Sequence, residues 1–89
     1  MKIVLNSCFG GFSVSDECAR ALNIKSNYDA DRMDPELIKM VEERPDWASG
    51  SYARLRVVEI PEEATDWETT EYDGVEGIIY VLDGKIHHA

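Results

Sequence analysis

An Asp-Gly pair in the last third of the chain most constrains what it can fold into. Asp73-Gly74 separates two segments, 66–72 and 75–82, that are rich in β-branched and aromatic residues. Such a pair supplies the two positive φ angles that a two-residue hairpin turn needs, so we expect the segments to form an antiparallel hairpin. Asp83-Gly84 predicts a second turn of the same type directly afterwards.

Two short helices are predicted in the first half of the chain. Asp34 is a favourable N-cap and Pro35 suits the first helical position, so we expect a helix that ends before Pro45. Ser15 predicts the N-cap of an earlier helix that ends near Asn23, because two acidic residues follow it in the first turn.

Two further strands are expected at residues 2–7 and 53–60. In the second, the alternation slips at Val57-Val58, which predicts either a β-bulge or burial on both faces. Because helices connect these strands, we expect a parallel pair with a right-handed crossover. The chain is therefore predicted to be a single α+β domain over residues 1–89. Its expected order is β-α-α-β-β-β, with two short helices on one face of a four-stranded mixed sheet.

The sequence favours a cytoplasmic protein without a cofactor. Its opening apolar run, Ile3-Val4-Leu5, is shorter than the roughly 7–15 residues of a secretory signal. No stretch approaches the ~20 apolar residues of a membrane span. Cys8 and Cys18 make neither a disulfide framework nor a Cys-x-x-Cys pair. Both histidines, His87 and His88, are terminal, so no internal histidine can activate a nucleophile or help to hold a metal.

The charge of the chain is concentrated in one segment. The formal net charge is −9, and residues 57–84 hold nine acidic residues and no basic one. One interpretation is a solvated face that maintains solubility. The other is a surface that docks on a basic partner. Direct binding to nucleic acid is disfavoured, because the chain has no basic stripe and its net charge repels phosphates.

The docking interpretation predicts a non-enzymatic binding protein and a particular set of side chains. Nucleic-acid-handling proteins are natural partners, because an acidic surface can occupy a groove that binds phosphates. An aromatic residue among charges, such as Trp67, resembles an interface anchor but suits a core equally well. The predicted docking residues are Glu62, Glu63, Trp67, Glu68, Glu71, Asp73 and Glu76.

A glycine-rich segment, residues 8–13, joins the first strand to the first helix. Its backbone N–H groups and the helix N-terminus offer an alternative function, a small-ligand module that binds an anion or nucleotide. The residues of that alternative are Gly10, Gly11, Ser13 and Ser15. The segment matches neither a dinucleotide-binding motif nor a P-loop. A structural interpretation competes, in which the glycines make a tight turn and Phe9 and Phe12 hold it against the core.

The opening motif is Lys2-Ile3-Val4-Leu5-Asn6-x-Cys8-Phe9-Gly10-Gly11-Phe12-Ser13-x-Ser15. Together with residues 32–43, 53–61 and 67–74, this motif resembles a family of small uncharacterised proteins from tailed bacteriophages and prophages. The likeness ends after the Asp73-Gly74 turn, where a second aromatic residue is expected near Gly77. The resemblance implies a phage or bacterial origin and an intracellular setting, and it implies no reaction.

Overall fold

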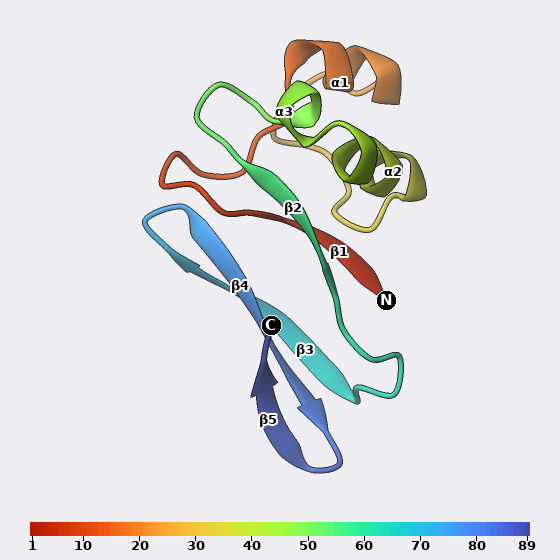
Figure 1. Cartoon of the computed structure of the whole chain (residues 1–89), viewed down its shortest axis with the longest axis vertical. Helices are drawn as coiled ribbons and strands as arrows, with labels where there is room; N and C mark the ends of the chain where they lie inside the picture. Colours follow the sequence, from red (N-terminus) through yellow and green to blue (C-terminus); the bar gives the residue numbers. More distant parts are fainter.

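The computed structural model in Figure 1 describes residues 1–89 and has three layers. The helices form one layer, β1 and β2 the second, and a sheet of order β3-β4-β5 the third. The elements are β1 (Lys2–Asn6), α1 (Asp16–Leu22), α2 (Pro35–Glu43), α3 (Pro45–Ala48), β2 (Leu55–Glu59), β3 (Asp66–Tyr72), β4 (Val75–Leu82) and β5 (Lys85–His88).

Both predicted helix starts are confirmed. The side chain of Ser15 accepts a hydrogen bond from the N–H of Cys18 at 3.0 Å, and α1 begins at the next residue. Asp34 accepts from the N–H of Glu36 at 2.9 Å, and Pro35 is the first residue of α2. These caps satisfy N–H groups that a helix leaves without an internal partner, so local sequence is enough to locate them.

The predicted hairpin is also confirmed, with β3 and β4 paired antiparallel at the expected bounds. Asp73 and Gly74 have φ angles of 51° and 89°, the left-handed conformation that a type I′ turn requires. Asp83 and Gly84, at 53° and 76°, make the second turn. That turn leads into β5, a strand that the sequence did not predict and that pairs with β4.

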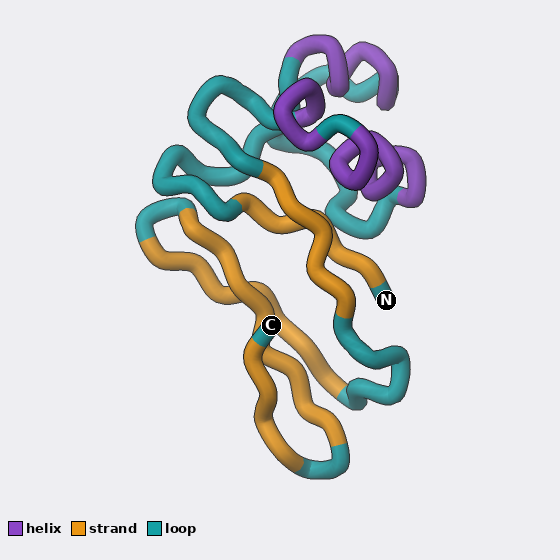
Figure 2. Tube along the Cα trace, viewed as in Figure 1, coloured by secondary structure: helices purple, strands orange, loops and turns teal.

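The predicted four-stranded mixed sheet is wrong. β1 and β2 pair antiparallel, with Lys2 opposite Glu59 and Asn6 opposite Leu55. The reason is that the chain leaves β1 and enters β2 at the same end of the sheet. There the segments 7–15 and 48–54 run side by side, joined by backbone hydrogen bonds such as Gly50 N–H to Ser13 O at 3.0 Å. Figure 2 shows these loops together at one end of the strands.

The second error is that β3 does not join β2, because the hairpin builds a sheet of its own. The slip at Val57-Val58 reflects burial on both faces of the middle sheet. Val57 packs against the cluster under the helices, while Val58 belongs to a second cluster between the two sheets. In that second cluster Ile3, Leu5 and Ile60 meet Ile78 of β4. The helices therefore cover one face of β1-β2 and the hairpin covers the other.

None of the three helices has the length and apolar content that a membrane span requires.

Candidate functional site

A buried amide, Asn6, joins the segments that position the end of the hairpin. Its Nδ2 donates to the carbonyl oxygens of Cys8 at 2.6 Å and Gly74 at 2.7 Å. Its Oδ1 accepts from the N–H of Arg54 at 2.8 Å and of Cys8 at 3.2 Å. Because all four hydrogen-bonding positions of the amide are used, the glycine loop, the start of β2 and the hairpin turn are held in one arrangement.

Two glycines allow these segments to approach each other closely. A Cβ on Gly74 would lie 2.5 Å from the backbone nitrogen of Gly11 and 2.7 Å from the carbonyl oxygen of Phe9. A Cβ on Gly10 would lie 1.9 Å from the carbonyl oxygen of Tyr52. Both contacts are below any distance that a real Cβ atom tolerates, so the close packing of these loops explains why the sequence has glycine there.

An ion pair between Arg32 and Glu76 ties the helical layer to the three-stranded sheet. Two guanidinium nitrogens donate to the two carboxylate oxygens, at 2.5 and 2.8 Å. The backbone N–H of Asn6 donates to the same carboxylate at 2.9 Å, and the guanidinium lies 3.9 Å over the ring of Phe12. The Glu76 side chain is only 10% exposed. Its charge is therefore used inside the molecule and is not presented to a partner.

The other predicted acidic docking residues lie at the surface, together with Asp66 at the start of β3. None of them takes part in any of the three ion pairs of the structure. We call these side chains the acidic hairpin surface: Glu62, Glu63, Asp66, Glu68, Glu71 and Asp73, all exposed.

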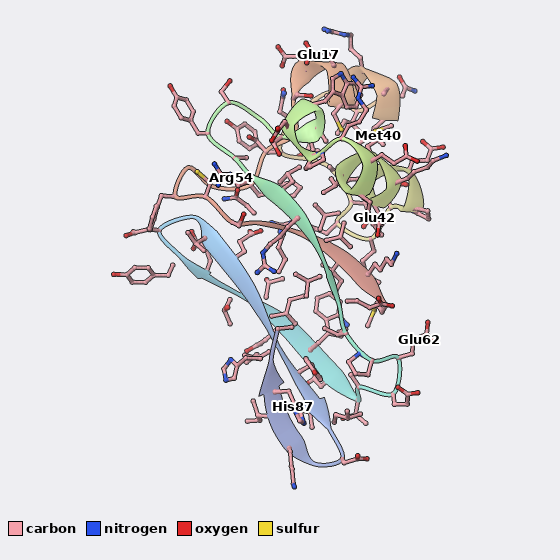
Figure 3. All side chains as sticks on the ribbon, in the orientation of Figure 1. Glu17, Met40, Glu42, Arg54, Glu62 and His87 are labelled. Carbon is pink, nitrogen blue, oxygen red and sulfur yellow. The ribbon has the colours of Figure 1, made fainter.

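The acidic hairpin surface extends along β3. Glu62 and Glu63 precede the strand and Asp73 follows it, so the two ends are about 20 Å apart at roughly 3.3 Å per residue. Figure 3 shows Glu62 at the corner of the molecule away from Arg54, with its side chain pointing outward. Glu71 lies opposite Glu76, so by alternation it is on the other face of β3 from Asp66 and Glu68, and its carboxylate accepts from the N–H of Gly74 at 3.0 Å. Trp67 is half-buried and packs against the apolar cluster between the two sheets, so its side chain also belongs to the core.

Among the residues of the anion alternative, Ser15 has both its hydroxyl and its N–H engaged within the fold. The Ser15 hydroxyl caps α1, and the Ser15 N–H donates to the carbonyl of Ala48 at 2.8 Å. Beside Gly10, Ser13 and Ser15 is a depression of about 540 Å³, also lined by the carboxylates Asp16, Glu17 and Asp46 and by no lysine or arginine. Like charges do not attract an anion, so the geometry gives the alternative no support and it stays a prediction.

The structural interpretation of the same loop needs one correction. Phe12 is half-buried and packs against the cluster under the helices, as expected. Phe9 does not hold the loop to the core, because its side chain is 72% exposed. The chain passes over the hairpin turn at this point, and the packing is made by the backbone of Phe9 against Gly74.

Sequence reasoning missed Asn6 and Arg32 as organising residues. Their partners lie far along the chain, at Gly74 and Glu76. A signal was present for Asn6, since an amide that directly follows a buried apolar run must find partners there. No local pattern links Arg32 to Glu76. No group of three or more His, Cys, Asp or Glu side chains is placed to hold a metal ion.

No protein-family model, curated protein or solved structure matches the chain.

Proposed function

We propose that this chain is a non-enzymatic binding protein of the bacterial cytoplasm that docks the acidic hairpin surface on a basic protein, of the kind that handles nucleic acid. One observation carries the proposal. Six exposed carboxylates lie along a single strand and its two ends, and no cation of the chain pairs with any of them. The bacterial setting is the one that the resemblance of the sequence to phage and prophage proteins implies.

The physical basis of the proposal is a group of unpaired negative charges that a basic partner can neutralise. Unpaired like charges repel one another, and this repulsion is relieved when lysine or arginine side chains of another protein approach. A surface of this kind accelerates encounter with a basic partner and discriminates against acidic ones. Salt weakens the attraction, because the screening length falls from about 10 Å at 0.1 M to about 3 Å at 1 M.

A matched pair of charge-reversal variants tests the proposal. The first changes Glu62, Glu63 and Glu68 to Lys, since these side chains make no hydrogen bond or ion pair within the chain. The second makes the same change in net charge at Asp29 of the α1–α2 loop, Glu43 of α2 and Asp46 of α3, which are also exposed and form no ion pair; this is the helical-layer variant. Each tagged protein and the parent are used to capture partners from a bacterial lysate.

We expect the parent and the helical-layer variant to capture a basic protein that the hairpin variant does not capture. Retention that is equal for all three proteins would contradict it, and so would loss with both variants, because net charge alone would then explain binding. Far-UV circular dichroism of each variant checks that the fold is intact.

A further inference from the structure

The three-stranded sheet has an inner face that is covered and an outer face that is not. Ile78, Tyr80 and Trp67 point inward, against the cluster shared with β1-β2. Side chains alternate along a strand, so Ile79 and Val81 of β4 point outward. Ile86 of β5 lies opposite Val81 and shares its face. Figure 1 shows the helices gathered over β1 and β2, and β4 is the strand of this sheet that contacts β1.

The outer face carries an apolar groove bordered by carboxylates. Ile79, Val81 and Ile86 line a groove of about 140 Å³, together with Asp66 and Glu68 of the acidic hairpin surface. Glu68 lies directly opposite Ile79 and Asp66 opposite Val81, which places the charges one strand away from the apolar side chains. Ile86 is 69% exposed, so nothing within the chain covers this end of the groove.

The rim charge decides what can occupy the groove. A second copy of this chain would bring another Asp66 and Glu68 to a face that already holds both, on a molecule whose net charge is −9. A segment with an apolar face flanked by lysine or arginine is complementary to the groove in both hydrophobicity and charge. It covers the isoleucines and valine and neutralises the rim.

We infer that the outer face of the β3-β4-β5 sheet receives an amphipathic basic segment of the partner, with its apolar side chains on Ile79, Val81 and Ile86 and its cations against Asp66 and Glu68. This inference rests on the proposed function and specifies it, because it adds an apolar anchor to a surface so far defined by charge. Lys85 does not oppose this arrangement, since it lies opposite Leu82 and by alternation belongs to the inner face.

Three designed helical peptides separate the apolar contribution from the charge. The first has leucines along one face and lysines on both sides of it. The second replaces the leucines with serine, and the third replaces the lysines with glutamate. Each is titrated into isotopically labelled protein at about 0.15 M salt while the backbone amide signals are followed by NMR. Ile86→Ser and Glu68→Lys remove the anchor and a rim charge, and Tyr28→Ser is the control on an equally exposed side chain of the helical layer.

The leucine-lysine peptide should shift the amides of Glu68, Ile79, Val81 and Ile86 in a saturable way. We expect Ile86→Ser to raise its dissociation constant about tenfold, the size typical of an interface anchor, and Tyr28→Ser to leave it unchanged. Glu68→Lys should also weaken binding, and the glutamate peptide should not bind. The amide spectrum of the Ile86→Ser variant serves as the check that this variant is folded.

Three results would overturn the inference, and they can be distinguished from one another. If the serine-lysine peptide binds as tightly as the leucine-lysine peptide, charge docking stands and the apolar anchor is refuted. If neither basic peptide binds, the proposed function fails with it. Shifts confined to the free edge of β3 would likewise refute the anchor, because they would indicate strand addition to that edge instead of docking on the face.

Discussion

Among single residues, Asn6 joins three segments that are far apart in sequence, through one fully satisfied amide. Asn6→Ala leaves the partly buried N–H groups of Cys8 and Arg54 and the buried carbonyl of Gly74 without these partners. Each buried group left unpaired costs about 1–3 kcal/mol, so we expect the free energy of unfolding to fall by about 3 kcal/mol. Urea denaturation measures this change. A fall below about 1 kcal/mol would mean that water replaces the amide.

The two turn glycines form a matched pair for testing the loop packing. Gly74 and Gly84 both have positive φ, but a Cβ meets backbone within 3 Å only at Gly74 and meets nothing within 4 Å at Gly84. Gly84→Ala should therefore cost about 1 kcal/mol of stability, from backbone strain alone. Gly74→Ala should cost at least about 2 kcal/mol more, because the loops must also separate. Equal losses for the two variants would contradict the close approach seen at Gly74.

The two thiols should differ in reactivity. Burial raises the pKa of the Cys18 thiol, which is fully enclosed under the helices, whereas Cys8 is half-buried in the glycine loop. Only the thiolate reacts, so Cys8 should be modified first by a thiol reagent at pH 8 and Cys18 should react at the rate of unfolding. The reaction of Cys18 should approach that of Cys8 when urea is added. Equal rates without urea would show that the helical layer opens freely.

At the level of elements, the sequence was sufficient to predict features that depend on neighbouring residues. It was not sufficient to predict how distant segments pair. The caps at Ser15 and Asp34 and the turn at Asp73-Gly74 depend on neighbouring residues, and all three were predicted from the sequence. The direction of β1 against β2 depends on loops that meet through contacts between residues about forty positions apart, and it was predicted wrongly. The Val57-Val58 pair did indicate burial on both faces of the strand. An apolar pair does not indicate which elements pack on each face.

The packing of one sheet on the other can be tested with two isoleucines of the same sheet. Ile78 is 1% exposed and lies between the sheets, while Ile86 is on the outer face. Ile78→Ala should lower the free energy of unfolding by about 2–4 kcal/mol, because it removes buried methyl groups and leaves a cavity. Ile86→Ala should change it by less than about 0.5 kcal/mol. Thermal or urea unfolding measures both, and similar losses would show that the sheets do not share a core.

At the scale of the whole molecule, the sequence located the acidic segment but could not divide its charges. Glu76 was predicted to be a docking residue, but its carboxylate is paired with Arg32, which lies 44 positions away along the chain. Asp66 was left out although it lies on the same exposed strand as Glu68. Charge counts give the sign and amount of charge in a segment, whereas the ion pairs that remove a charge from the surface depend on the tertiary fold.

For the molecule as a whole, we propose that the unpaired carboxylates along β3 bind a basic protein. The most direct measurement is the dissociation constant of the captured partner at several salt concentrations, for the parent and for the variant with Glu62, Glu63 and Glu68 changed to Lys. We predict that affinity for the parent falls at least about tenfold between about 0.05 and 0.5 M salt, and that the variant binds weakly at every concentration. An affinity that is independent of salt and equal for the two proteins would contradict the claim and leave the acidic hairpin surface as a solubility feature.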